Sequence, residues 1–343
     1  MIANVKLFGA SGDGTGDDTS AIRLARESLL LTGSDRSGVL YFPQGIYRLD
    51  PSTLEGGAAI LLERNSITGD PEITLQGDGN GATILQCIPN VPVFRICGSQ
   101  TDFVRRLHFR DFTIYGGRTA ILGESWGYSS VSGMELRNTS SYAMEIRNAN
   151  GSYSDSCTFD SFALDIHHNL IIHTLSHGIF LNGASLWTTL HHNTFGEDIR
   201  GFSVMLQSCR GVTVDHNRII STAGSVGRSG IELQGVGKGC AIIGNQIDGL
   251  AEHGIEITGE QHSLVIAYNQ IRDISRRLPL TYDGIYQQPG SVCEGLRILG
   301  NSIDNTAAMP IRLSSAPRGL VADNLWAIGA SVTLGGAQIR DNN

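Results

Sequence analysis

The sequence lacks the features that mark membrane-spanning, secreted and nucleic-acid-binding proteins. No run of about 18 consecutive apolar residues occurs. The first residues also lack the basic region followed by an apolar run that is typical of a signal peptide. The chain has 25 basic and 33 acidic residues, a formal net charge of −8, and its Lys and Arg residues form no persistent cluster. We therefore expect neither a membrane span nor a nucleic-acid partner.

Cysteine is scarce and its spacing fits neither a metal site nor a disulfide framework. The six cysteines stand at positions 87, 97, 157, 209, 240 and 293, without the paired spacing of a zinc site. Most of them have apolar neighbours in the sequence. The pattern predicts buried free thiols, which are typical of a reducing compartment.

Glycine is abundant instead, and the chain repeats itself. There are 43 glycines among 343 residues. A pattern of an apolar residue, two variable residues, asparagine and another apolar residue two positions later recurs along the second half. Its asparagines are Asn169, Asn193, Asn217, Asn245, Asn269, Asn301 and Asn324, at spacings of 24, 24, 28, 24, 32 and 23 residues. A second apolar strand follows each of the first six, as in "GIEL" at 230–233 and "GIEI" at 254–257.

A repeat of this length predicts a solenoid. Each unit holds short alternating strands separated by turns, and it cannot bury its own apolar side. Neighbouring units must therefore stack into a continuous core, as in a parallel β-helix. We expect the asparagines to form a buried ladder at one turn, because asparagine tolerates left-handed backbone geometry and can hydrogen-bond to the asparagine of the next coil.

The first 50 residues have a different character. The run "DDTS" provides N-caps for a short amphipathic helix. Its predicted apolar face consists of Ala21, Ile22, Leu24, Ala25, Leu29 and Leu30. We expect this helix to cover the open edge of the first coil. The sequence thus predicts an N-terminal capping segment at 1–50 and a β-helix at 51–343, within one domain overall.

This opening resembles that of the pectate lyase-like right-handed parallel β-helix superfamily. In that superfamily a Gly-Asp-Gly, Asp-Asp-Thr and Ala-Ile run precedes a "YFPxGxY" strand, which is "YFPQGIY" here. Phage tailspikes, polysaccharide depolymerases, polygalacturonase-like enzymes and epimerases share this opening. The resemblance implies an all-β, right-handed parallel β-helix with a short N-terminal capping α-helix, and a polysaccharide or oligosaccharide partner.

The repeat also predicts which side chains share a face, because alternate residues of a strand point to opposite sides. One outward column reads Phe180, Met205, Glu232, Glu256, Tyr286 and Arg312. A second outward column reads Asn182, Gln207, Gln234, Thr258, Gln288 and Ser314. The residues before the strands include His253 and Asp283.

Glu232 and Glu256 are candidates for catalysis. Adjacent coils would bring them about 5 Å apart at the backbone. Two carboxylates that close divide into one that holds a proton and one that does not, as glycoside hydrolysis requires. The alternative is that both glutamates only solvate the face, paired with Arg228 or Arg312. Insertions before the strands of Glu232 and Tyr286 favour the functional interpretation, because loops added at one place on a rigid stack usually carry function.

The match to individual enzyme families is partial. Polygalacturonases carry a Gly-His-Gly motif and acidic pairs on successive coils, and only His253-Gly254 matches here. A lyase or epimerase would use His253 or Tyr286 as the base, with an arginine to neutralise the uronate. Calcium is possible for a lyase, held by Glu232, Glu256 and Asp283; otherwise no cofactor is expected.

The predicted catalytic set is therefore Glu232, His253, Glu256, Asp283 and Tyr286. The predicted substrate-binding set is Phe180, Asn182, Trp187, Gln207, Arg228, Gln234, Gln288 and Arg312. A weaker alternative is a zinc or nickel site at His168, His192 and His216, which recur at 24-residue steps. In that region "DIH" at 165–167 faintly resembles the Asp-Pro-His of alginate epimerases.

We therefore predict an enzyme that acts on polysaccharide, with hydrolysis by paired carboxylates ahead of elimination or epimerisation. Two further hypotheses are a non-catalytic glycan-binding spike and a structural coil of a homotrimeric fibre, with outward apolar residues such as Phe180, Met205 and Trp326 buried between subunits. The absence of a signal peptide fits a phage virion protein, a cytoplasmic enzyme or a trimmed form of a longer protein.

Overall fold

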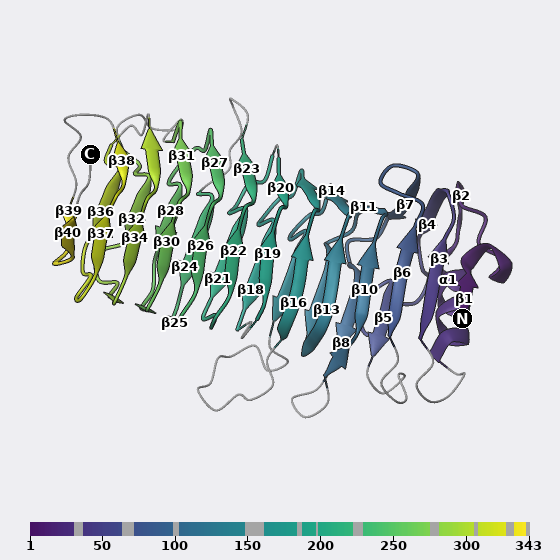
Figure 1. The fold of residues 1–343 in the computed structure, drawn as a ribbon. Coiled ribbons are helices and arrows are strands. Elements are labelled where there is room, and N and C mark those ends of the chain that lie inside the picture. Colours follow the sequence, from purple (N-terminus) through teal and green to yellow (C-terminus); the bar gives the residue numbers. More distant parts are fainter. Residues whose placement is uncertain are drawn as a thin grey trace. The chain divides into compact units, whose positions relative to one another are not determined.

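The computed structural model describes residues 1–30, 37–63, 72–98, 103–147, 161–183, 187–196, 198–221, 229–274, 281–304, 308–326 and 333–340. The chain divides into two compact units, Met1–Thr174 (unit 1) and Leu175–Asn343 (unit 2), each built from stacked strands (Figure 1). This division differs from the predicted boundary after residue 50, which stays a prediction.

Unit 1 consists of three sheets of parallel strands. The first sheet runs in the order β1 (Ile2–Asn4), β3 (Gly38–Phe42), β6 (Ile73–Gly77), β10 (Leu107–Arg110), β13 (Trp126–Ser132) and β16 (Phe162–His167), with β9 (Val104–Arg105) also paired to β13. The second contains β2 (Asp13–Asp17), β4 (Gly45–Leu49), β7 (Thr83–Cys87), β11 (Thr113–Gly116), β14 (Glu135–Arg137) and β17 (Leu170–Ile172). The third contains β5 (Ile60–Glu63), β8 (Pro92–Cys97), β12 (Thr119–Glu124) and β15 (Met144–Arg147).

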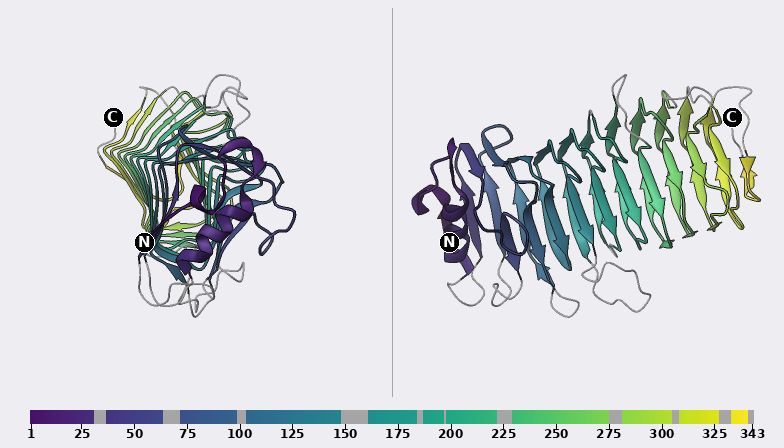
Figure 2. Two further views of the ribbon diagram at one scale, coloured as in Figure 1. Left: turned by 90° about the vertical axis from the view of Figure 1, so that its right-hand side faces the viewer. Right: turned by 180° about the vertical axis from the view of Figure 1, so that it is seen from behind.

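One helix covers the first coil of unit 1. Helix α1 (Thr19–Leu30) packs against the 3₁₀ helix η1 (Val5–Phe8), β1 and β3, and Figure 2 shows it lying across the N-terminal end of the unit. Ala21, Ile22, Ala25 and Leu29 are buried, as predicted. The prediction is wrong for Leu24, which is 54% exposed. Position 24 lies two residues beyond Ile22, about 200° around the helix and therefore on its opposite face.

Unit 2 has three sheets of the same kind and a short fourth one. The first contains β19 (Thr189–His191), β22 (Thr213–Asp215), β26 (Ala241–Ile243), β30 (Val265–Ala267), β34 (Arg297–Leu299), β37 (Leu320–Ala322) and β40 (Gln338–Arg340). The second contains β20 (Thr194–Phe195), β23 (Arg218–Ile220), β27 (Gln246–Asp248), β31 (Gln270–Arg272), β35 (Ser302–Asp304) and β38 (Leu325–Trp326). The third contains β18 (Ile179–Asn182), β21 (Val204–Gln207), β24 (Ile231–Gln234), β28 (Ile255–Ile257), β32 (Ile285–Gln287), β36 (Ile311–Leu313) and β39 (Thr333–Leu334). The fourth contains β25 (Gly237–Lys238), β29 (Gln261–His262) and β33 (Cys293–Glu294).

The core of unit 2 is a set of apolar stacks, one residue per coil. In the third sheet the inward residues Ile179, Val204, Ile231, Ile255, Ile285 and Ile311 have no exposed surface. Because β-branched side chains fit a pleated strand and each one packs on its counterpart in the next coil, the repeat supplies its own core. The all-β parallel β-helix prediction is confirmed. Within the described ranges, no helix has the length and apolar character that crossing a bilayer requires.

The asparagine ladder of unit 2 also forms as predicted. The side-chain amide of Asn193 donates to Oδ1 of Asn217 at 3.0 Å, and Asn217 donates in the same way to Asn245. The series continues through Asn269 and Asn301. Asparagine is not, however, the left-handed residue of the turn. The positive φ angles belong to the residues before the asparagines, which are His192, His216, Gly244, Tyr268, Gly300 and Asp323.

Candidate functional site

The third sheet of unit 2 places the predicted outward column in one row. The strands are in register, so that Glu232 of β24 pairs with Glu256 of β28, and Glu256 pairs with Tyr286 of β32. The row reads Phe180, Met205, Glu232, Glu256, Tyr286 and Arg312. The repeat therefore predicted the relative positions of these side chains correctly.

The side chains of this row all point outward, but they differ in their exposure to solvent. Phe180, Met205 and Glu232 are 9%, 8% and 5% exposed. Glu256 and Tyr286 are half-buried, so their side chains are accessible to a ligand on this face. The accessible part of the row therefore begins at Glu256.

Each glutamate has a hydroxyl partner that the sequence did not single out. The hydroxyl of Ser229 donates to Oε2 of Glu256 at 2.8 Å, and that of Thr258 donates to Oε1 of Glu232 at 2.8 Å. Ser229 is buried, and its oxygen also accepts a hydrogen bond from the backbone amide of His253. These bonds hold the two carboxylates in fixed orientations.

His253 is held as a neutral ring beside Tyr286. Its ring stacks on that of Tyr286, with centroids 4.2 Å apart and an interplanar angle of 6°. The backbone amide of Asp283 donates to Nδ1 of His253 at 2.9 Å. Burial, together with the nearby charge of Arg312, lowers the pKa of His253 to about 4. Because Nδ1 accepts, the proton of the neutral ring lies on Nε2, and His253 offers a donor there rather than a base.

Asp283 and Arg312 form an ion pair at the edge of the same group. Oδ1 of Asp283 accepts hydrogen bonds from the Met309 amide at 2.9 Å and from the Arg312 guanidinium at 3.2 Å, and its Oδ2 lies 3.1 Å from Nε of Arg312. Asp283 is fully buried, and this burial raises its pKa. The Arg312 guanidinium lies 6.0 Å from the ring centre of Tyr286. Burial raises the pKa of Tyr286, and the charge of Glu256 adds to the effect, so the phenol is protonated at neutral pH.

We call these residues the carboxylate–histidine cluster: Ser229, Glu232, His253, Glu256, Thr258, Asp283, Tyr286 and Arg312. All five predicted catalytic residues and Arg312 belong to it. Of the other predicted binding residues, Asn182, Gln207 and Gln234 are paired in a row on the same sheet. Gln288 is exposed just beyond β32, and Trp187, 70% exposed, precedes β19 of the first sheet. Arg228 and most of both insertions, at 222–228 and 275–280, lie outside the described residues.

The histidine repeat does not assemble as a metal site in the described part of the chain. No group of three or more His, Cys, Asp or Glu residues there is arranged to hold a metal ion. Nδ1 of His168 instead lies 2.8 Å from Nδ1 of His167. The ring of His192 stacks on that of His216, with centroids 5.5 Å apart, and His216 contacts Asp215.

Unit 1 contains a second charged group that the sequence did not reveal. Oε2 of Glu124 on β12 accepts a hydrogen bond from Arg95 on β8 at 2.7 Å, and its Oε1 accepts one from Arg147 on β15 at 2.9 Å. Arg147 also lies 3.5 Å from Glu145, whose pKa is raised by burial. We call Arg95, Glu124, Glu145 and Arg147 the arginine–glutamate cluster. Two of its members, Glu145 and Arg147, lie in the "AMEIRN" stretch. Because the early coils are irregularly spaced, the sequence does not show which residues of the neighbouring coils these two pair with.

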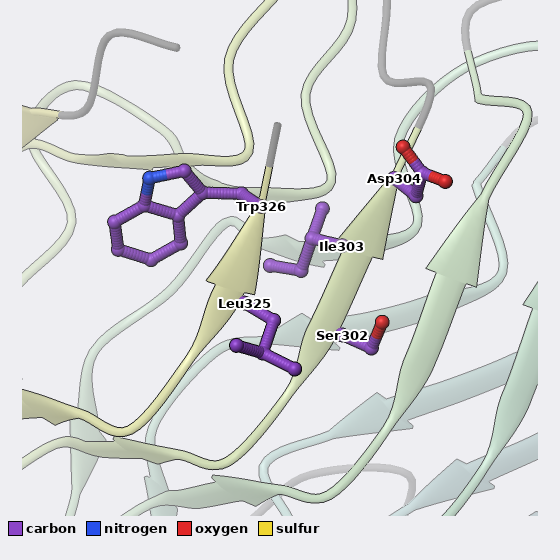
Figure 3. Close-up of a pocket in the computed structure, with 5 residues that line it drawn as sticks. All are labelled: Ser302, Ile303, Asp304, Leu325 and Trp326. Atoms are coloured by element: carbon purple, nitrogen blue, oxygen red, sulfur yellow. The ribbon is translucent and has the colours of Figure 1, made fainter. Parts of the chain in front are cut away.

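A surface pocket of about 270 Å³ lies elsewhere in unit 2, between β35 and β38 of the second sheet (Figure 3). It is lined by Ser302, Ile303, Asp304, Leu325 and Trp326. Asp304 is its one titratable residue, so the pocket has no second acid or base to share a proton transfer. We therefore place the candidate site at the cluster.

Comparison with known proteins identifies the family. Residues 2–232 match the family model described as "Rhamnogalacturonase A/epimerase, pectate lyase-like", and residues 160–325 match that of the "Right handed beta helix region". The chain is 29% identical over 160 residues to mannuronan C5-epimerase AlgE1 of Azotobacter vinelandii, covering 44% of this chain and 10% of that protein. It is 33% identical over 88 residues to alginate lyase 7 of the same organism, covering 26% and 9%. The chain thus matches only a small part of these longer relatives.

Solved structures show the same fold at low sequence identity. The A-module of mannuronan C-5 epimerase AlgE6 from Azotobacter vinelandii aligns with a TM-score of 0.64 and 16% identity, covering 99% of this chain and 98% of that one. DFA-IIIase from Arthrobacter chlorophenolicus A6, without its lid, aligns with a TM-score of 0.70 and 15% identity, covering 98% and 93%. These likenesses confirm the right-handed parallel β-helix. With two thirds of its length matched by the family model, the chain belongs to the rhamnogalacturonase A/epimerase group of pectate lyase-like proteins.

Proposed function

We propose that this protein is an enzyme that acts on an acidic polysaccharide by removing the proton beside a uronate carboxyl group, which leads to epimerisation or to elimination. The observation that carries the proposal is the row formed by half-buried Glu256, Tyr286 and Arg312, with uncharged His253 stacked on the tyrosine. Relatives named as mannuronan C5-epimerases and an alginate lyase support this class of reaction.

The proposal assigns a role to each group. Glu256, oriented by Ser229, takes the proton from C5 of the uronate. The half-buried guanidinium of Arg312 faces the uronate carboxylate, whose negative charge grows as the proton leaves. His253 is buried and positions Tyr286 by stacking on its ring. The protonated Tyr286 phenol then supplies a proton, either to C5 from the opposite side or to the oxygen that leaves C4. This departs from our expectation that His253 or Tyr286 is the base, because Nδ1 of His253 is occupied and the pKa of Tyr286 is raised.

The three predicted calcium ligands do not fit a calcium site. Calcium prefers six to eight oxygen ligands. Asp283 is fully buried and paired with Arg312, and Glu232 and Glu256 are held by different hydroxyl groups. The proposed reaction therefore uses no calcium ion at these three residues.

Hydrolysis is the second candidate reaction, and one specific observation favours it. Glu232 and Glu256 are directly paired across adjacent strands, an arrangement that can supply an acid and a base to one glycosidic bond. Hydrolysis ranks second because Glu232 is buried. A substrate on the accessible face would reach the Glu232 carboxylate only with difficulty.

One set of assays distinguishes these reactions. Wild type and Glu256→Gln would be incubated with sodium alginate, with Glu294→Gln as the control, since Glu294 lies on the fourth sheet of the same unit. Elimination creates an absorbing unsaturated uronate together with new ends, epimerisation changes only the uronate composition, and hydrolysis creates reducing ends without the absorbing group. We expect elimination or epimerisation in wild type and in the control, and a loss of about a thousandfold in Glu256→Gln. Equal rates in all three proteins, or binding of alginate without any product, would contradict the proposal.

A further inference from the structure

Unit 1 carries an aromatic group that no part of the proposed reaction uses, in which Tyr128 is exposed, Phe162 is half-buried and Phe103 is buried. The rings of Tyr128 and Phe162 lie 5.1 Å apart, Phe103 lies 4.9 Å from Phe162, and all three meet edge to face or tilted. Tyr128 is 50% exposed, although tyrosine buries much of its surface in most folds. We call Phe103, Tyr128 and Phe162 the aromatic platform.

The backbone is shaped to present this platform. Tyr128 has a φ of +48°, a left-handed conformation that is unusual for a bulky residue. The preceding residue, Gly127, lets the ring of Phe162 lie over the strand, because a Cβ there would approach the Phe162 carbonyl oxygen to 2.9 Å and its ring to 3.3 Å.

Two arginines stand beside the platform. The guanidinium of Arg105 lies 4.7 Å from the ring centre of Phe103. Arg106 is exposed, and its backbone amide donates to the carbonyl oxygen of Tyr128 at 3.2 Å. Flat aromatic surfaces contact the apolar faces of sugar rings, while arginines bind carboxylates with paired hydrogen bonds. The combination fits an acidic sugar better than a neutral one.

The arginine–glutamate cluster lies close to the platform in the sequence of unit 1. Strand β12 ends at Glu124, and Tyr128 follows four residues later, so their Cα atoms lie at most about 14 Å apart. Arg95 and Arg147 lie on the neighbouring strands β8 and β15. Both arginines are paired with glutamates there, whereas the Arg105 guanidinium lies over the Phe103 ring of the platform.

From these contacts we propose that the aromatic platform, with Arg105 and Arg106, is a binding site for a uronate residue of an acidic polysaccharide. The choice of polymer rests on the proposed function. The site itself is tested by binding, and its failure is therefore separable from failure of the catalytic proposal.

The test measures binding of sodium alginate by affinity electrophoresis and calorimetry, in a Glu256→Gln background that prevents turnover. Tyr128→Ala and Arg105→Gln are compared with Tyr268→Ala. Tyr268 is a suitable control because it is 66% exposed and also left-handed, with a φ of +56°, but lies in unit 2. We expect the dissociation constant to rise about tenfold in Tyr128→Ala and about fivefold in Arg105→Gln, and to stay unchanged in Tyr268→Ala. Dextran, a neutral polymer, should bind none of the proteins.

Three outcomes would overturn the inference: no binding of alginate by the background protein, equal binding by Tyr128→Ala and Tyr268→Ala, or self-association in light scattering that disappears in Tyr128→Ala. The last would make the platform a contact between copies of the chain. Weaker binding by Tyr128→Ala, with no turnover of alginate by the otherwise unaltered chain, would support the site and refute the proposed reaction.

Discussion

Protonation of His253 should weaken the fold in mild acid. The pKa of His253 falls from 6.5 to about 4 on folding, chiefly because the ring is buried. The native state therefore prefers the neutral ring. This preference contributes to the unfolding free energy, and the contribution is complete above pH 6.5. The stabilisation is lost as the pH falls toward 4, because the unfolded chain binds the proton first.

The size of this stabilisation follows from the change in the pKa of His253 on folding. At about 1.4 kcal/mol per pH unit, a pKa lowered from 6.5 to about 4 corresponds to about 3 kcal/mol, of which about 2 kcal/mol is lost by pH 5. In His253→Gln this dependence should vanish. The measurement is the difference in unfolding free energy between wild type and His253→Gln, from denaturant titrations between pH 7.5 and pH 4.

A second measurement determines the pKa of the His253 ring directly. The imidazole proton signals of wild type are followed by NMR through the same pH range, and the His253 signal is assigned by its absence in His253→Gln. A midpoint near 4 agrees with a buried ring whose Nδ1 is occupied by the Asp283 amide. A midpoint near 6.5, or a free-energy difference that does not vary with pH, would refute the conclusion that His253 is buried as a neutral ring.

Three further changes test other parts of the account. Tyr286→Phe keeps the ring that stacks on His253 but removes the phenol proton, so we expect turnover of alginate to fall about a hundredfold with unchanged unfolding; unchanged turnover would exclude the phenol as the acid. Asn245→Ala removes the acceptor of the buried Asn217 amide and should cost about 3 kcal/mol in denaturant titrations, whereas exposed Gln288→Ala should cost almost nothing. Glu124→Gln leaves two arginines without their carboxylate and should destabilise the protein by about 3 kcal/mol, and a neutral effect would show that those arginines are solvated.

The row of the candidate site was predictable because the repeat fixes its register. A parallel stack pairs each residue with its counterpart one coil away, so aligning "GIEL" with "GIEI" was enough to pair Glu232 with Glu256. The same alignment placed Tyr286 and Arg312 in that row. The core and the asparagine ladder followed for the same reason.

Other features depend on contacts that a period does not specify. The donors from Ser229 and Thr258 require side-chain orientations, and the tautomer of His253 depends on one backbone amide. The burial of Glu232 follows from its neighbours rather than from the direction in which its side chain points.

Two features were missed because local patterns gave an incomplete or misleading signal. The asparagine turn was misinterpreted because both a left-handed residue and a ladder residue are common roles of asparagine, and here the preceding residue, such as His192 or His216, takes the left-handed role. The arginine–glutamate cluster was missed because the coils of unit 1 have unequal lengths, so the partners of Glu124 could not be aligned by counting.

The most direct test of the central claim follows hydrogen at C5 of the substrate. Wild-type protein is incubated with sodium alginate in heavy water, and the uronate residues of the polymer are examined by NMR. The proposed removal of the C5 proton predicts either deuterium at C5 of inverted residues or an unsaturated residue at new chain ends, and neither in Glu256→Gln. Cleavage of the chain with every C5 proton retained and no unsaturated ends would contradict this account and establish hydrolysis instead.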